Sequence, residues 1–378
     1  MVPAPPGYDG IMQIPMVDLH AQYLEIKEEI DAAIAEVIQN SAFIKGPFVE
    51  RFEVAFAQFL GVEHCIGVGN GTDALVIALK ALGIGPGDEV ITAVNTFVAT
   101  PEAISLTGAR PVFCDVEPGS MLLDPDLIKE RLTEQTRAII PVHLYGRVAA
   151  MDRILDVARQ HQLKVVEDAA QAHGAQVGGV TAGAFGDAST HSFFPGKNLG
   201  AYGDAGAIVT CNEEAALFAR QYANHGRSTK YGHQFEGMNS RLDGLQAAVL
   251  SVKLRYLERW CELRREHART YTRLLQGIEG ITCPEMPEAE QHVFHLYVIR
   301  TPYRDALREH LASKGINTGI HYPQIMAELP AYRKNAGPPE DYPVAAALSS
   351  EILSLPLYPE MTAEQIEIVV AEIRLFCR

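Results

Sequence analysis

The chain has 378 residues, of which 47% are hydrophobic and 21% are charged, a composition typical of a globular protein with a large core. Its 47 acidic and 32 basic residues give a formal net charge of −15, which repels polynucleotide phosphates and anionic membranes, so we expect neither as a partner. The six cysteines form no CxxC pair, residues 1–7 lack a signal-peptide pattern, and no apolar run reaches transmembrane length. These features predict free thiols in the cytoplasm.

Strand and helix patterns alternate through the first half of the chain, after an amphipathic stretch around 23–39. Apolar runs predict strands, and apolar residues spaced by one helical turn predict helices between them. The predicted strands are 64–68, 89–94, 111–115, 137–142 and 163–167, and the predicted helices follow at 72–82, 99–106 and 151–161. This alternation indicates a mostly parallel sheet that is covered by helices on both faces.

The pattern changes after residue 188. Two strand-like runs, 189–193 and 206–210, have no helix between them, which predicts an antiparallel excursion at the edge of a seven-stranded sheet. One long helix over Leu242–Leu275 is then expected to lead out of the large domain. A strand at 296–300 and helices at 303–314 and 363–376 predict a smaller α+β domain, with the division between 1–250 and 251–378.

A glycine-rich turn, Gly69-Asn70-Gly71-Thr72, precedes a helix directly after a strand. The first backbone N–H groups of such a helix and its dipole make a phosphate site, to which the Thr72 hydroxyl can add a donor. An ordinary strand-to-helix turn is the alternative. A dinucleotide site is disfavoured, because the third glycine and the acidic residue after the next strand are missing.

Asp168 ends a buried strand, at the edge where open α/β sheets bind ligands. A carboxylate there can pair with the nitrogen of a pyridine ring and keep it protonated. Metal binding with Glu167 and His173 is the alternative. Because Glu167 points to the opposite face of the strand, we expect no metal site.

Lys197 lies on a short loop bounded by glycine and proline, between Ser192 and Gly200. A Schiff base requires a neutral amine, and partial burial lowers the pKa of a lysine toward neutrality. Ser192 offers a hydroxyl to the same phosphate as the glycine-rich turn. The alternative is a solvated surface lysine. Taken with Asp168, the loop predicts a site for pyridoxal 5′-phosphate.

Six motifs follow one another along the chain: Gly69–Leu75 (GNGTDAL), Gly83–Val90 (GIGPGDEV), Val142–Gly146 (VHLYG), Val166–Gln171 (VEDAAQ), Ser192–Gly200 (SFFPGKNLG) and Asn239–Asp243 (NSRLD). In this order they resemble the DegT/DnrJ/EryC1/StrS family of nucleotide-sugar aminotransferases, which are fold-type-I pyridoxal phosphate enzymes. The resemblance runs from about Val17 to the C-terminus. A branch of the family replaces the lysine with histidine and dehydrates its substrate. Since Lys197 is retained, the resemblance implies transamination.

The resemblance also implies residue roles. Lys197 would bind the cofactor aldehyde and move the proton. Asp168 would hold the ring nitrogen, Gln171 would bind the ring oxygen, and Phe97 would stack on the ring. The phosphate would be bound by Gly71, Thr72 and Ser192. Asn239 would reach the phosphate of the neighbouring subunit, which implies a homodimer with shared active sites. L-glutamate would donate the amine and leave the pyridoxamine form, to which a nucleotide-linked keto sugar binds in a second half-reaction.

The substrate follows from weaker similarities. His173 after Gln171-Ala172 is similar to the 3-keto-sugar branch, where it would act in catalysis; the alternative is that it only packs beside the sheet. His321-Tyr322 resembles a segment that lines the sugar site. Lys45, Arg227, Lys230 and Tyr231 are candidates for the diphosphate or are solvated surface side chains. The expected substrate is a dTDP-3-keto-6-deoxyhexose. The alternatives are a UDP-linked 3-keto uronate, a 4-keto sugar, a cyclitol ketone, and, from other classes, a non-catalytic sugar-binding or regulatory protein or a dinucleotide oxidoreductase.

Overall fold

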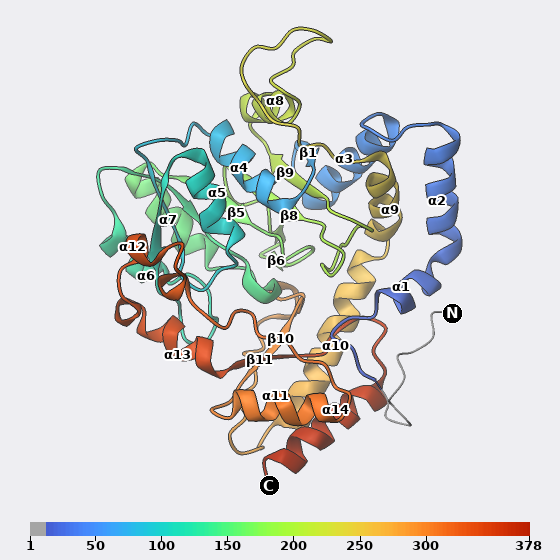
Figure 1. Ribbon diagram of the computed structural model, residues 1–378, viewed down its shortest axis with the longest axis vertical. Coiled ribbons are helices and arrows are strands. Elements are labelled where there is room, and N and C mark those ends of the chain that lie inside the picture. Colours follow the sequence, from blue (N-terminus) through green and yellow to red (C-terminus); the bar gives the residue numbers. More distant parts are fainter. Residues whose placement is uncertain (1–12) are drawn as a thin grey trace.

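A seven-stranded sheet forms the centre of the larger part of the protein (Figure 1). The computed structural model describes residues 13–378, so the proline-rich start lies outside the described residues. The strands are β1 (His64–Val68), β2 (Glu89–Ala93), β3 (Arg110–Cys114), β4 (Thr136–Ile140), β5 (Lys164–Asp168), β8 (Ala188–Ser192) and β9 (Gly206–Thr210), in the order β1-β9-β8-β5-β4-β2-β3. The predicted seven-stranded, mostly parallel sheet is confirmed.

The two antiparallel pairings lie at one edge of this sheet. The strands from β3 to β8 pair in parallel, whereas β9 runs antiparallel to both β8 and β1. The antiparallel excursion predicted around the Lys197 loop is therefore confirmed. Because β8 and β9 have no helix between them, the loop that joins them stays at the end of the sheet.

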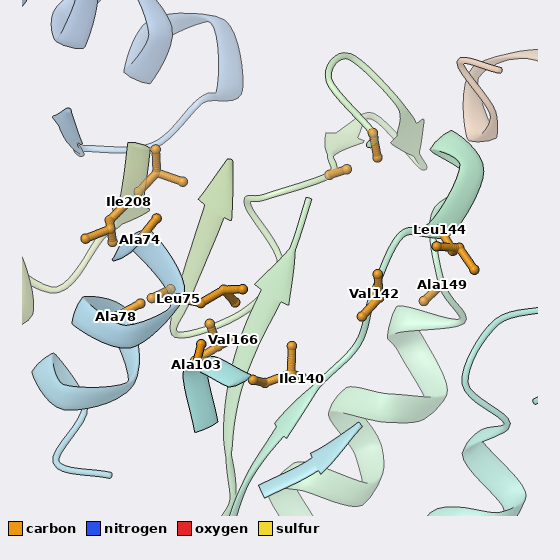
Figure 2. Packing of buried hydrophobic residues seen from close by; sticks show 14 of the residues in the cluster. Ala74, Leu75, Ala78, Ala103, Ile140, Val142, Leu144, Ala149, Val166 and Ile208 are labelled. Carbon is orange, nitrogen blue, oxygen red and sulfur yellow. The ribbon is translucent and has the colours of Figure 1, made fainter. Parts of the chain in front are cut away.

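Helices cover both faces of the sheet. On one face, α4 (Gly71–Ala81) lies between α5 (Ala99–Thr107) and α8 (Glu213–Tyr222). Small side chains of α4 and α5 gather with side chains from the strands in one buried cluster, which brings helix and sheet close together (Figure 2). The labelled members include Ala74, Leu75, Ala78, Ala103, Ile140, Val166 and Ile208.

On the other face, α3 (Pro47–Leu60) packs its phenylalanines against β8 and the residue that follows it. Phe56 meets His191 edge-on at 4.9 Å between ring centroids, and both Phe52 and Phe56 meet Phe193 edge-on. The remaining helices and small strands of this part are α1 (Leu19–Glu25), α2 (Lys27–Gln39), α6 (Pro125–Ile128), α7 (Met151–His161), β6 (Gln176–Val177) and β7 (Val180–Thr181).

The long helix predicted over Leu242–Leu275 was wrong as a single element. The chain instead forms α9 (Gly244–Leu254) and α10 (Leu257–Leu275), separated at Arg255–Tyr256. The buried neighbours change along this stretch: α9 packs against α2 and α3, the first turns of α10 still contribute Leu257 and Cys261 to the larger core, and the later turns pack against α14 in a second core. One straight helix cannot serve all these surfaces, so the helix breaks along this stretch.

A second, separate core lies at the lower end of the molecule in Figure 1. It is built on the antiparallel pair β10 (Tyr297–Arg300) and β11 (Ile352–Leu355) with α10, α11 (Arg304–Ser313) and α14 (Ala363–Phe376). The intervening α12 (Arg333–Ala336) and α13 (Pro343–Glu351) place buried side chains in the larger core instead. The domain division at 250/251 stays a prediction.

Within residues 13–378, no helix combines the length and apolar character needed to cross a bilayer.

Candidate active site

A cavity of about 600 Å³ lies at the carboxyl edge of the sheet, where β5 and β8 end. This is the position where open α/β sheets bind ligands. Eight residues singled out in the sequence line it: Gly71, Thr72, Phe97, Asp168, Gln171, Ser192, Lys197 and Tyr322. Segments that are far apart in the chain therefore meet at one site.

The glycine-rich turn forms one end of the cavity, and α4 begins there. Asn70 caps the helix, because its side-chain oxygen accepts a hydrogen bond from Asp73 N at 2.8 Å. Among the described residues, the N–H groups of Gly71 and Thr72 have no hydrogen-bond acceptor. A Cβ on Gly71 would lie 2.7 Å from Ser192 Cβ, so only glycine fits. Two free N–H donors at a helix N-terminus, next to a serine, suit a phosphate group.

Asp168 is buried in the wall of the cavity and held by two donors. The Thr100 hydroxyl donates to its Oδ2 at 2.9 Å, and the backbone N–H of Ala170 donates to its Oδ1 at 3.2 Å. Thr96, which also lines the cavity, lies 2.8 Å from Thr100 between their hydroxyl oxygens. The carboxylate is thus fixed in orientation while it faces the cavity.

Glu167, the neighbour of Asp168, lies on the opposite face of the strand, as the sequence predicts. It is fully buried, and its carboxylate accepts hydrogen bonds from the backbone N–H groups of Gly183, Phe185 and Gly186. Its Oε2 also lies 2.9 Å from His143 Nε2. These bonds occupy both carboxylate oxygens, so Glu167 holds the loop at 183–186 and does not face the cavity. Among residues 13–378, no cluster of His, Cys, Asp or Glu is arranged to hold a metal ion.

Gln171 and Tyr322 form a connected polar wall. Gln171 Oε1 accepts from Tyr145 N at 2.6 Å, and its Nε2 donates to the Tyr322 hydroxyl at 3.3 Å. Burial, together with the nearby charge of Asp168, raises the pKa of Tyr322, so the phenol stays protonated. The exposed Phe97 ring lies 5.3 Å from the Tyr322 ring, which leaves an apolar face open to a flat ligand.

Lys197 lies half-buried on the loop that joins β8 and β9. The loop is tight: Lys197 N donates to Phe194 O at 2.8 Å, and a Cβ on Gly200 would lie 2.2 Å from Pro195 O. Asn198 anchors it by donating to Val293 O at 3.2 Å. Burial lowers the pKa of Lys197 to about 8, against the opposing effect of the Asp168 charge. An amine with this pKa is available as a nucleophile near neutral pH.

His173 is not among the residues that line the cavity. It is fully buried, with its ring 5.4 Å from the ring of His191 and 5.6 Å from Phe193. Burial lowers its pKa well below the usual range, with smaller contributions from the neighbouring His191 and from the positive charge of Lys197. The structure therefore places a neutral imidazole close to Lys197, behind the cavity wall. The catalytic role expected for His173 stays a prediction.

The remaining predicted site residues also lie outside the cavity. Asn239 is exposed, and Arg227 and the 83%-exposed Tyr231 lie on the loop after α8 that extends from the body of the molecule (Figure 1). Lys45 lines a separate hollow with Arg220 and Arg241. His321 bonds Ser354 through Nδ1, at 2.8 Å. Within this one chain, none of them reaches the ligand cavity.

Sequence reasoning missed several residues that line the cavity. They are Asp73, Leu75, Thr96, Ala99, Val142, Leu144, Ala170, Thr190, His191, Phe194 and Asp204. Thr190 and His191 were identifiable, since they directly precede Ser192 at the carboxyl end of a predicted strand. Among the described residues that line the cavity, Lys197 has the only cationic side chain, beside the acidic Asp73, Asp168 and Asp204.

Proteins of known sequence are similar to this chain over nearly its whole length. The chain is 47% identical over 369 residues to a "pleiotropic regulatory protein" of Geobacillus stearothermophilus, covering 97% of this chain and 99% of the relative. It is 43% identical over 362 residues to the dTDP-3-amino-3,4,6-trideoxy-alpha-D-glucose transaminase of Streptomyces venezuelae, covering 96% of each.

Solved structures share the fold. A crystal structure of S. venezuelae DesV in complex with a ketimine intermediate superposes with a TM-score of 0.94 at 43% identity, covering 97% of this chain and 99% of the other. The structure of NtdA from Bacillus subtilis with bound cofactor PMP gives a TM-score of 0.90 at 34% identity, covering 97% and 85%.

A family model matches residues 24–374, which include every residue that lines the cavity. The chain therefore belongs to the DegT/DnrJ/EryC1/StrS aminotransferase family.

Proposed function

We propose that this aminotransferase uses pyridoxal 5′-phosphate to move an amino group from L-glutamate to a nucleotide-linked keto-deoxyhexose. The observation that carries the proposal is the half-buried Lys197, whose pKa burial lowers to about 8 in a cavity that also holds Asp168. Asp168 and the open N-terminus of α4 offer partners for a ring nitrogen and a phosphate.

The residues present fit this cofactor. The free N–H groups of Gly71 and Thr72 with Ser192 would hold the phosphate, Asp168 would hold the ring nitrogen, and Phe97 offers a ring face. When bound, the cofactor supplies an aldehyde that reacts with amines and a ring that takes up electrons.

Two side chains of the cavity carry the remaining chemistry. Lys197 Nζ, neutral in part near pH 7, would hold the proton that moves during each half-reaction. The Gln171 amide, fixed by Tyr145 N through its oxygen, would donate its remaining N–H to the oxygen of the ring.

For the acceptor we propose a dTDP-3-keto-6-deoxyhexose. Support comes from the S. venezuelae relative, whose name describes a 3-amino sugar linked to dTDP. A UDP-linked 3-keto uronate, a 4-keto sugar and a cyclitol ketone are the competing acceptors. We place the reaction in the cytoplasm, in keeping with six free cysteines.

We further propose a homodimer with shared active sites. The acceptor's diphosphate and the carboxylates of glutamate are anionic. Among the described residues that line the cavity, however, only Lys197 has a cationic side chain. The exposed Lys45 and Asn239 and the partly buried Arg227 are not among the residues that line the cavity of their own chain. A second copy would supply these groups to the site, as a charged substrate requires.

The cofactor is tested by absorption spectroscopy. Purified protein reconstituted with pyridoxal phosphate is expected to absorb visible light and to lose that band on addition of L-glutamate. In Lys197→Ala the wild-type visible band is expected to be absent. A colourless wild-type protein that ignores added cofactor would contradict the proposal.

The acceptor is tested with a panel of dTDP- and UDP-linked 3-keto and 4-keto sugars and a cyclitol ketone, each assayed for glutamate-dependent amino-sugar formation. The highest kcat/KM is expected for the dTDP-3-keto-6-deoxyhexose. A higher value for any other member of the panel would replace it as the proposed substrate.

A regulatory function is the second candidate, because the Geobacillus relative carries the name of a regulatory protein. A regulator and the proposed enzyme differ in whether glutamate is consumed. A regulator without catalysis would bind a sugar nucleotide without consuming glutamate, whereas the proposed enzyme forms 2-oxoglutarate in proportion to the amino sugar.

A further inference from the structure

The side chain of Thr100 lies behind the cavity and contacts Asp168 directly. Thr100 is fully buried in the first turn of α5, and its hydroxyl donates to Asp168 Oδ2 at 2.9 Å. We infer that Thr100 is a positioning residue, which orients the Asp168 carboxylate toward the ring nitrogen of the cofactor. The inference rests on the proposed cofactor.

The hydroxyl groups of Thr96 and Thr100 form a chain of hydrogen bonds that ends at Asp168, and each donor in it can be assigned. A threonine hydroxyl has a single hydrogen, and Thr100 gives its hydrogen to the carboxylate. At 2.8 Å between their oxygens, Thr96 must therefore donate to Thr100. Each bond polarises the next, so the donor of Thr100 is stronger than that of an isolated hydroxyl.

The dipole of α5 also stabilises the negative charge of Asp168. The first residue of α5 is Ala99, so the positive end of the helix lies beside the Thr100–Asp168 contact. The backbone N–H of Thr100 donates to Phe97 O at 3.1 Å. Thr100 therefore contacts Asp168 through its side-chain hydroxyl and not through its backbone. Phe97 at the start of the same segment faces the cavity. One segment thus contacts both the carboxylate and the space for the ring.

The contact has a specific consequence for binding. Asp168 Oδ2 has no other protein donor among the described residues, and Oδ1 has only the longer bond from Ala170 N, at 3.2 Å. Without Thr100 the carboxylate can rotate and draw water, and its pairing with a ring N–H weakens. A ligand that lacks the ring nitrogen gains nothing from this orientation.

The test compares two ligands in apo protein freed of cofactor: pyridoxal 5′-phosphate and 1-deazapyridoxal 5′-phosphate, in which CH replaces the ring nitrogen. Thr100→Val keeps the shape and removes the donor. It is expected to raise the Kd for pyridoxal phosphate about tenfold, the usual effect of one hydrogen bond to a charged group, and to leave the Kd for the deaza compound within about twofold. Both are measured by titrating absorbance or protein fluorescence.

Two variants serve as controls. Thr100→Ser restores the hydroxyl and is expected to bind pyridoxal phosphate like the wild type. Thr107→Val removes a buried hydroxyl from the same helix, one that donates to Ile104 O at 2.7 Å. It is expected to lower the thermal midpoint without changing either Kd. If Thr100→Val does not fold, Thr100→Ala gives the same comparison.

The outcomes separate the two proposals. An equal loss of affinity for both ligands, or an unchanged Kd for pyridoxal phosphate in folded Thr100→Val or Thr100→Ala, overturns the role of Thr100 alone. Failure of the wild-type protein to bind pyridoxal phosphate overturns the proposed cofactor, and the inference with it.

Discussion

At the scale of single residues, burial sets how much of the Lys197 amine is neutral. An ordinary lysine with a pKa near 10.5 has about one neutral amine in three thousand at pH 7, whereas a pKa of about 8 gives about one in ten. The opposing charge of Asp168 keeps the pKa from falling further.

We therefore expect the rate at which trinitrobenzenesulfonate labels Lys197 in apo protein to rise with pH and to level off above about pH 8. In Asp168→Asn the midpoint should move to lower pH, because removing the negative charge removes the effect that raises the pKa of Lys197. Peptide mass spectrometry at each pH measures the labelling. A midpoint near 10.5 in the wild-type protein would show that Lys197 is solvated like a surface lysine.

Much of the candidate site was visible as residue types in sequence. Lys197, Asp168, Gly71 and Ser192 stand in motifs whose glycines and strand ends already indicate a ligand site, and the structure brings them to one cavity. The sequence did not indicate a role for Thr100, because a threonine in a predicted helix is common and its contact with Asp168 is known only from the structure.

At the scale of elements, the carboxyl ends of β4 and β5 are joined by a buried polar contact. Ala149 N donates to His143 Nδ1 at 3.1 Å, so the ring hydrogen is on Nε2 and is donated to Glu167. Glu167 in turn holds the loop at 183–186, which fixes the strand that carries Asp168.

Replacing Glu167 with glutamine is expected to lower the free energy of unfolding by about 3 kcal/mol. Each carboxylate oxygen accepts from two N–H donors, and the NH₂ group of glutamine would face two of them. Urea unfolding followed by circular dichroism measures the change. Glu130→Gln, at an exposed position, is the control and should be neutral; equal stability of the two variants would refute the role of Glu167.

The one wrong element has a related cause. The sequence between Leu242 and Leu275 has helical periodicity throughout, but its buried side chains pass from the larger core, in α9 and the first turns of α10, to the second core in the later turns of α10. Local periodicity does not reveal which core a turn of helix will meet.

At the scale of the whole molecule, the proposed homodimer rests on the charges around the cavity, whose described lining residues include three aspartates and one cationic side chain, Lys197. Lys45, Arg227 and Asn239 are displaced from the cavity of their own chain, as groups that serve a second copy would be.

Mixing Lys197→Ala with Asn239→Ala under conditions that exchange subunits is expected to restore part of the activity. In a mixed dimer, one of the two sites would receive both an intact Lys197 and an intact Asn239. Glutamate-dependent turnover before and after mixing measures the recovery, with native mass spectrometry as the check on exchange. Proven exchange without recovery would argue against shared sites.

The sequence by itself determined the type of sheet, the order of its strands along the chain and the residue types that stand on the Lys197 loop, because these depend on local periodicity and on residues adjacent in the chain. The tertiary structure decided which side chains face the cavity. It brought Thr100 to Asp168 across 68 positions of sequence, and it buried His173 behind the wall. The contact between Thr100 and Asp168 depends on where α5 lies relative to β5, and a local sequence pattern does not determine the relative position of two elements that are far apart in the chain.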